Sequence, residues 1–284
     1  MVFGCDRSAE RRPVRGSPMK ISVVTIALNS ADTIADTLRS VAVQDWPDFE
    51  HIIVDGASTD GTLAVVAKNA HDRLSVVSEP DHGLYDAMNK GLARASGEVI
   101  GFLNSDDFFC RPDALSLIAA ALAWGSDSVS GQTVIVDRED VSRVRRVYGT
   151  RFYAPWMLRF GHMPSHPSFY LRRSVFDRLG GFDASYRIAG DFELMVRLFA
   201  RARTTMTMIP ETLVAFRDGG ISTKDFRTKL TLNREFRRAL KTHKVASHPA
   251  LLWGRYPFKV WQKIGTADDY PHYLHGMKLP VADR

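Results

Sequence analysis

Cysteine is scarce in this chain: among 284 residues, only Cys5 and Cys110 occur. Two cysteines cannot build a disulfide framework, so the sequence indicates a reducing compartment. Long apolar runs are also missing, and none reaches the roughly 20 residues that a membrane-spanning helix needs. Hydrophobic residues make up 45% of the chain and charged residues 25%, which is the usual balance of a globular protein with a sizeable core. Together these features argue against a disulfide scaffold and against a membrane-spanning helix.

Several signatures of other protein classes are absent as well. No G-x-G-x-x-G loop follows the first expected strand, which argues against a dehydrogenase. The net charge is +6, and it gathers in residues 7–20 and 224–263. Such segments suit nucleic acid or an anionic membrane surface, and without a nucleic-acid motif we expect no nucleic acid partner. Residues 1–18 lack the apolar core of a signal peptide and are expected to be a disordered lead-in.

Apolar segments rich in β-branched residues alternate with helical patterns over the first 110 residues. The expected strands cover 20–28, 51–54, 74–77 and 98–103, and the expected helices cover 31–43, 63–70 and 84–95. This alternation predicts a parallel, doubly wound α/β sheet. Further on, the patterns indicate helices at 113–123 and 190–201, strands at 128–136, 143–148, 205–209 and 212–217, and a helical segment from Lys224.

Acidic side chains stand where two of these strands end. Asp106 and Asp107 follow the apolar run 99–103, and Asp55 follows the run 51–54. Open α/β sheets bind ligands at the carboxyl ends of their strands, and Mg²⁺ is typically held by one or two carboxylates plus substrate phosphates. Asn-Ser-Asp-Asp is also good turn chemistry, so a solvated turn is the alternative. Asp55 could accept hydrogen bonds from a base or ribose, or be an ordinary loop carboxylate.

Blocks of sequence at 22–29, 54–62, 81–91, 95–98 and 102–107, with thinner matches at 166–169, 180–183 and 189–193, stand in one order and spacing. In these blocks the chain resembles the family 2 glycosyltransferases, which have the GT-A fold. The resemblance implies a Rossmann-like, mostly parallel central sheet flanked by helices, with a C-terminal helical extension. It also implies inverting transfer of a sugar from a nucleotide-diphosphate donor to a hydroxyl of a saccharide or lipid-linked acceptor, in cell-surface or exopolysaccharide biosynthesis.

The resemblance assigns donor-side roles to particular residues. Asp55 matches the acid that contacts the nucleoside. Asp106 and Asp107 match the motif for Mn²⁺ or Mg²⁺ and the ribose diphosphate, with Asp107 preferred as the direct ligand and Asp106 near the ribose or the metal's waters. Asn29 and Lys90 are included among the donor-binding residues; their alternatives are a helix cap and an exposed helix cation.

The family pattern is not matched everywhere. Gly56 stands where the family commonly has a second acid, so we expect one contact to the base of the nucleotide to be missing. The usual D-x-D appears as Ser105-Asp106-Asp107.

On the acceptor side, Asp191 matches the catalytic base, because a carboxylate has to take the proton of the attacking hydroxyl. Its alternative is the N-cap of the following helix. His166 is placed on the acceptor side, with an ordinary loop histidine as the alternative. Its spacing from His162 resembles a zinc pair, but the intervening prolines argue against a continuous helix there. Arg197 is expected to pair with Glu193, four residues earlier.

The expected domain organisation is a lead-in at 1–18, a donor-binding half at 19–110, an acceptor-binding half at 111–222, and a basic aromatic helical tail at 223–284. The tail either touches anionic lipid or packs on the catalytic domain. We therefore expect a cytoplasmic protein, with peripheral contact at the inner face of the membrane as an extension. Two other classes stay open: a sugar-nucleotide pyrophosphorylase, whose glycine-rich basic loop is replaced here by residues 29–32, and a non-catalytic nucleotide-sugar-binding module.

Overall fold

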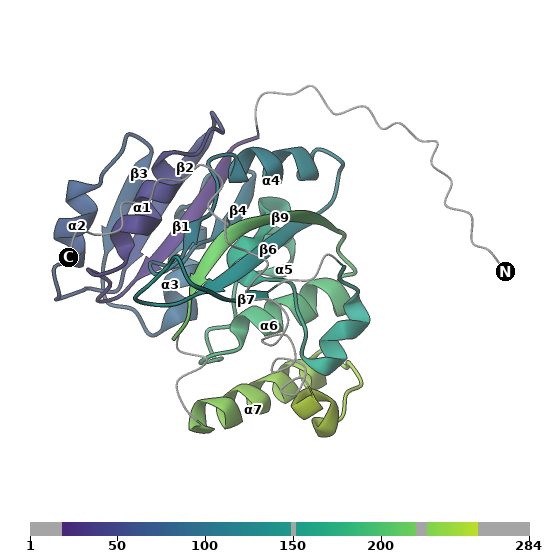
Figure 1. Ribbon diagram of the computed structural model, residues 1–284. Coiled ribbons are helices and arrows are strands. Elements are labelled where there is room, and N and C mark those ends of the chain that lie inside the picture. The colour runs from purple at the N-terminus through teal and green to yellow at the C-terminus, as the bar shows by residue number, and fades with distance from the viewer. Residues whose placement is uncertain (1–18, 149–151, 220–225, 255–284) are drawn as a thin grey trace.

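A computed structural model describes residues 19–148, 152–219 and 226–254 (Figure 1). The expected lead-in at 1–18 and the last part of the basic tail lie outside these residues. Within the described residues, nine strands form one sheet in the order β3-β2-β1-β4-β8-β6-β9-β5, with β7 paired to β6. Helices cover this sheet, as the alternating sequence pattern predicts.

The first half of the sheet is parallel. It consists of β1 (Ile21–Ala27), β2 (Phe49–Asp55), β3 (Leu74–Ser78) and β4 (Val99–Phe102), joined by α1 (Ile34–Ala42), α2 (Thr62–Lys68) and α3 (Leu84–Arg94). These seven elements confirm the predicted β-α alternation. Because the strands run the same way, their carboxyl ends lie at one edge of the sheet.

The second half of the sheet is mixed. β8 (Phe169–Arg172) runs antiparallel to both β4 and β6 (Ser128–Val136), while β9 (Met206–Arg217) runs parallel to β6. β5 (Phe108–Phe109) pairs with β9, and β7 (Val144–Tyr148) pairs with β6. The sequence missed the short strands β5 and β8. The sheet crosses residue 110 without a break, so the division into donor and acceptor halves stays a prediction.

The two strands predicted at 205–209 and 212–217 are one strand, β9. It continues through Pro210, and its register against β6 shifts in this region. Proline lacks an N–H and is tolerated in a sheet where the hydrogen-bond ladder is irregular. Pro210 therefore does not end the strand, although the sequence pattern predicted a break there.

The remaining labelled helices are α4 (Ala114–Leu122), α5 (Arg173–Leu179), α6 (Gly190–Met195) and α7 (Phe226–Thr242), and residues 249–254 are helical as well. The sequence missed α5. Directly after α6 the chain forms a π-helical segment, η3 (Val196–Arg201), so the helix predicted at 190–201 is confirmed with a change of pitch. Short 3-10 segments, η1 (Pro155–Phe160) and η2 (His166–Ser168), lie in the expected proline-rich loop.

The core lies on both faces of the sheet. Along β1, Val24 and Ile26 enter one apolar cluster while Ile21 and Val23 enter another, which is why this strand is apolar at nearly every position. The larger cluster includes Phe236, Ala239 and Leu240 of α7. Figure 1 shows α7 beside α6 at the lower edge of the molecule. The described part of the tail is therefore packed on the domain. None of its helices, nor any other described helix, is long and apolar enough to cross a membrane.

Candidate active site at the edge of the parallel sheet

Asp55 is fixed at the end of β2 by neutral donors. Its side chain is fully buried. The backbone N–H of Ser58 donates to one carboxylate oxygen at 3.0 Å, the Ser58 hydroxyl donates to the other, and the Ser78 hydroxyl donates at 2.6 Å. Asp55 is thus a strand-end acid with a set orientation, rather than a loose loop carboxylate.

Asn29 lies beside Asp55 at the same edge. Its backbone N–H donates to the Ser58 hydroxyl at 2.8 Å, and its side-chain oxygen accepts the Thr59 N–H at 2.9 Å. Its φ of 49° is left-handed, a conformation that asparagine adopts more readily than most residues. The alternative role as a helix cap is wrong, because the N-cap of α1 is Thr33.

Gly56 explains one departure from the family pattern. A Cβ at this position would lie 2.4 Å from a carboxylate oxygen of Asp81 and 3.3 Å from the Leu28 side chain. The Asp81 carboxylate therefore occupies the space beside residue 56, where a second acidic side chain would begin. Leu28, which is 56% exposed, offers an apolar surface next to it.

The Asp106–Asp107 turn holds two acids in very different surroundings. The Asp107 side chain is fully buried, and burial followed by the charge of Asp106 holds the pKa of Asp107 well above its usual value. The Asp106 side chain remains 26% exposed, and burial raises its pKa as well. Asp106 is therefore the more accessible of the two carboxylates, and the preference for Asp107 as the direct metal ligand stays a prediction.

Two arginines lie near this turn, Arg138 and Arg217, but among the described residues neither makes a close ion pair with Asp107. The contacts of Asp107 with the described residues are long: the Arg217 backbone N–H and the Asn104 side-chain amide each donate to it at 3.4 Å. The Arg138 guanidinium lies 4.0 Å from Asp106. The buried side-chain oxygen of Asn104 has no hydrogen-bond partner among the described residues.

Amide and carboxylate oxygens are the ligands that Mg²⁺ and Mn²⁺ prefer, so the turn formed by residues 104–107 fits such an ion. The described residues contain no group of three or more His, Cys, Asp or Glu side chains that would hold a metal ion alone. Phosphate oxygens of a substrate would have to complete the coordination.

Arg217, which the sequence did not single out, braces this turn. It is 3% exposed at the end of β9. One guanidinium nitrogen donates to the Asp106 carbonyl at 2.7 Å, and another pairs with Asp36 of α1. Its charge is therefore largely balanced by Asp36. Nothing in the local sequence marks an arginine at a strand end for this role, since its partners come from distant segments.

The ammonium group of Lys90 is paired with groups of its own region of the chain. It donates to the Pro80 carbonyl at 2.6 Å and lies 3.5 Å from both Glu79 and Asp86. The pair with Asp86, four residues earlier, is the arrangement expected of an ordinary helix cation. The structure favours this alternative over a donor-binding role.

Asp191 lies in the first turn of α6. The N-cap of that helix is Ala189, so the N-cap alternative is wrong. The Tyr85 hydroxyl donates to the carboxylate at 3.3 Å and the Phe192 N–H donates at 2.7 Å. Burial raises the pKa of Asp191, and the nearby imidazole of His166 opposes that rise.

His166 and Asp191 are thus brought together by the fold. The His166 ring is 8% exposed and stacks on Phe102 with ring centroids 6.1 Å apart. Burial lowers the pKa of His166, while the charge of Asp191 raises it. Phe102 ends β4, four residues before Asp106, so the histidine links the Asp191 region to the acidic turn. His166 begins the short η2 within the proline-rich loop, and its role on the acceptor side stays a prediction.

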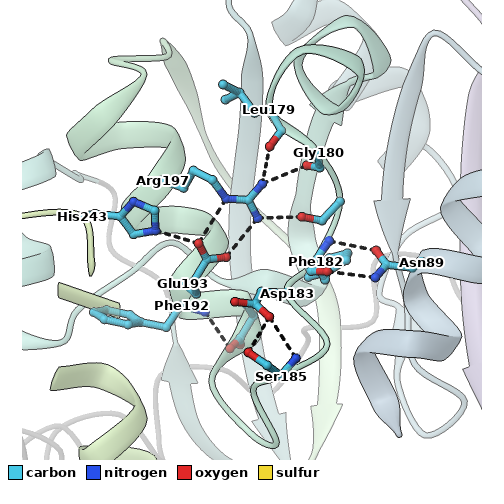
Figure 2. Close-up of polar contacts among 12 residues, drawn as sticks. Asn89, Leu179, Gly180, Phe182, Asp183, Ser185, Phe192, Glu193, Arg197 and His243 are labelled. Atoms are coloured by element: carbon cyan, nitrogen blue, oxygen red, sulfur yellow. Dashed lines mark hydrogen bonds and ion pairs between the residues drawn. The ribbon is translucent and has the colours of Figure 1, made fainter. Parts of the chain in front are cut away.

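Glu193, two residues after Asp191, takes part in a polar network that Figure 2 shows. The predicted pair of Glu193 and Arg197 is confirmed at 2.9 Å. Arg197 also donates to the carbonyls of Leu179 at 2.6 Å, Gly180 at 3.0 Å and Gly181 at 2.6 Å. His243, which follows α7, lies 2.7 Å from Glu193. The network ties α7 to the helix that carries Asp191.

Comparison with known proteins shows the family of the chain. Residues 22–180 match the model of glycosyl transferase family 2. A PGL/p-HBAD biosynthesis glycosyltransferase of Mycobacterium bovis (strain BCG / Pasteur 1173P2) is 30% identical over 227 residues, covering 76% of this chain and 86% of the relative. The putative teichuronic acid biosynthesis glycosyltransferase TuaG of Bacillus subtilis is 43% identical over 90 residues, covering 31% of this chain and 36% of TuaG.

Solved structures share the fold. S. aureus TarS 1-349 in complex with UDP-GlcNAc has a TM-score of 0.65 at 22% identity, covering 82% of this chain and 70% of that one. The mannosyltransferase PcManGT from Pyrobaculum calidifontis, in complex with GDP-Man and Mn²⁺, has a TM-score of 0.53 at 19% identity, covering 93% and 88%.

The mixed sheet with acids at one edge is that of a GT-A glycosyltransferase, and the predicted fold class is confirmed. The chain belongs to glycosyl transferase family 2. It is an enzyme of glycosyl transfer, as the sequence predicted. The two other classes considered, a pyrophosphorylase and a non-catalytic binding module, gain no support from the comparisons.

Proposed function

We propose that this enzyme is an inverting, metal-dependent transferase that moves a sugar from a nucleotide-diphosphate donor to a hydroxyl of a saccharide or lipid-linked acceptor in cell-surface or exopolysaccharide assembly. The observation that carries this proposal is the turn at 104–107, where two neighbouring acids and an unpartnered amide oxygen lie together without a close ion pair among the described residues. Support for the chemistry comes from the neighbours in complex with UDP-GlcNAc, GDP-Man and Mn²⁺. Support for the setting comes from the relatives named for PGL/p-HBAD and teichuronic acid biosynthesis.

On the donor side, Asp55 and Asn29 hold the nucleoside at the ends of β1 and β2. Asp81 supplies a carboxylate beside Gly56, and Leu28 offers an apolar surface to the base. Asp106 and the Asn104 oxygen hold Mn²⁺ or Mg²⁺, while buried Asp107 adds negative charge and shapes the turn. When bound, the ion would neutralise charge developing on the leaving diphosphate.

On the acceptor side, Asp191 takes the proton of the attacking hydroxyl as the bond between the sugar and the diphosphate breaks. An ordinary aspartate has a pKa of about 3.9, and the raised pKa of Asp191 makes it a better base at neutral pH. The Tyr85 hydroxyl orients the carboxylate. His166 lines the acceptor side between Asp191 and β4.

A thermal-stabilisation screen tests this assignment. UDP- and GDP-sugars are screened, each with Mn²⁺ and with chelator. One of these donors should raise the melting temperature of the protein, and only when the metal is present. At a donor concentration of 100 times Kd, binding raises the free energy of unfolding by about 2.7 kcal/mol. Purified Asp106→Asn should lose the metal-dependent part, and Lys229→Gln, at an exposed position of α7, should keep it. Equal stabilisation of wild type and Asp106→Asn would contradict the assignment.

We also propose peripheral contact between α7 and an anionic membrane surface. Arg227, Arg234, Arg237 and Lys241 are exposed at helical spacing and have no ion pair within the described part of the chain. Trp253, 41% exposed, lines a shallow pocket with Arg234 and Arg237. Each cation near an anionic surface contributes about 1 kcal/mol.

A vesicle sedimentation assay tests this contact. Vesicles with phosphatidylglycerol should sediment the protein, and vesicles of phosphatidylcholine alone should not. The double variant Arg234→Gln with Arg237→Gln should bind the phosphatidylglycerol vesicles more weakly. Equal binding to both vesicles would contradict the proposal.

A further inference from the structure

We propose that Glu235 of α7 is a positioning residue that sets the direction of the Asp191 carboxylate. This inference rests on the proposed role of Asp191 as the base. Glu235 does not touch the expected substrate region; it acts through the backbone that leads into α6. It also lies outside the residues 22–180 that match the family model, so the family match does not account for it.

Glu235 binds three consecutive backbone amides. One of its carboxylate oxygens accepts the N–H of Arg187 at 2.8 Å, and the other accepts those of Ile188 at 2.9 Å and Ala189 at 2.8 Å. Ala189 is the N-cap of α6, and its own side chain makes no capping hydrogen bond. A carboxylate suits this place, because amides at a helix start lack internal partners and carry partial positive charge.

The same short loop is held from its other side by Tyr85. The Tyr85 hydroxyl donates to the Ile188 carbonyl at 2.7 Å and also to the Asp191 carboxylate at 3.3 Å. Ile188 is therefore fixed through its N–H by Glu235 and through its C=O by Tyr85. Only Ala189 and Gly190 separate it from Asp191, so the orientation of the Ile188 peptide determines where the Asp191 side chain points.

Two further contacts hold α7 in register with α6. The rings of Phe236 and Phe192 stack with centroids 3.8 Å apart and planes 5° from parallel. His243 lies 2.7 Å from Glu193 (Figure 2). Both Phe192 and Glu193 follow Asp191 directly, so α7 contacts the chain on each side of Asp191. Glu235 contributes the contact on the N-terminal side.

The test is Glu235→Gln, in which one acceptor oxygen becomes an NH₂ group that faces backbone N–H donors. We expect kcat for transfer to fall about 10- to 100-fold, as expected for a misplaced catalytic group, with less than a twofold change in donor KM. The raised pKa of Asp191 comes from burial, so a displaced carboxylate should shift the acid limb of the kcat profile to lower pH. Lys229→Gln, at an exposed position of the same helix, is the matched control and should leave both unchanged.

A double-mutant cycle shows whether Glu235 acts through Asp191. In the Asp191→Asn background, Glu235→Gln should cause no further loss of kcat. An additional 10-fold loss there, or full kcat and an unmoved acid limb in the single variant, would overturn the inference. If Glu235→Gln does not fold, Glu235→Asp is the second variant, because it keeps the carboxylate on a side chain that is one methylene shorter. It should shift the acid limb of the kcat profile to lower pH in the same way. Full transfer by Asp191→Asn would instead overturn the proposed base, and this inference with it.

Discussion

Glu193 and Asp107 are both buried acids, at 4% and 0% exposure, yet their surroundings differ. Glu193 pairs with Arg197 at 2.9 Å and with His243 at 2.7 Å. Asp107 has two contacts of 3.4 Å and a second acid next to it. The first charge is balanced by the protein itself. The second is left for something that the protein binds.

This difference separates structural charge from functional charge. A buried charge without close partners is costly, and proteins keep such groups where a ligand completes them. The Glu193 charge is balanced by Arg197 and His243, so this network can hold the helix that carries Asp191 in place. The turn at 104–107 is incomplete, so a cation and a diphosphate would stabilise it. The predictions below follow from this contrast, from the largest expected effect to the smallest.

Asp191→Asn should lower kcat by about 10²- to 10⁴-fold, the usual contribution of a general base. The affinity for the donor should stay within twofold of the wild-type value, because the substitution does not change Asp55 or Asp106 at the donor-binding edge of the sheet. Steady-state transfer kinetics and calorimetric titration with the nucleotide measure the two effects. If Asp191→Asn lost donor binding as well as kcat, Asp191 would have a structural role. The contrast between the region of Glu193 and the turn at 104–107 would then be wrong.

Arg197→Met should lower the free energy of unfolding by about 3–5 kcal/mol, because it leaves the Glu193 charge buried beside His243 alone. The matched control is Arg138→Met: Arg138 is 54% exposed and 4.0 Å from Asp106, and loss of such an exposed pair changes stability by about 0–1 kcal/mol. Chemical denaturation measures both. Similar losses in the two variants would remove the distinction between balanced and unbalanced charge.

Asp107→Asn should raise the melting temperature of the metal-free, nucleotide-free enzyme at neutral pH by a few degrees. The raised pKa of Asp107 means that its favourable, protonated state is fully present below the unfolded pKa of about 3.9. That contribution is lost as pH rises through the folded pKa, and asparagine avoids the loss. Melting curves against pH with chelator should show the gain disappearing near pH 4. A lower melting temperature at neutral pH would contradict this account.

The acid limb of kcat should lie above the pH expected of an ordinary aspartate. Burial raises the pKa of Asp191, and a base works only when ionised, so activity should fall as pH drops through that raised value. A kcat profile with saturating donor and metal measures it. A limb near pH 4 or below would mean that Asp191 is solvated during turnover.

The sequence predicted what depends on local pattern. The four parallel strands followed from apolar runs, and Asp55 and Asp106 fell at their ends because parallel strands share an edge. Other features depend on distant segments. Arg217 and Glu235 act on partners that sit more than 40 residues away in the chain, and no periodicity marks them. The sequence also could not show that Asp107 is buried while Asp106 is partly exposed, because burial of a turn residue is set by the tertiary packing around it.

The most direct test of the central claim is calorimetric titration of the enzyme with its nucleotide-diphosphate donor, with Mn²⁺ and with chelator, in wild type and Asp106→Asn. The incomplete charge at the 104–107 turn predicts tight binding of the donor only with Mn²⁺, and loss of that metal dependence in Asp106→Asn. Equal affinity with Mn²⁺ and with chelator in the wild type would contradict the claim that this turn is a metal–diphosphate site.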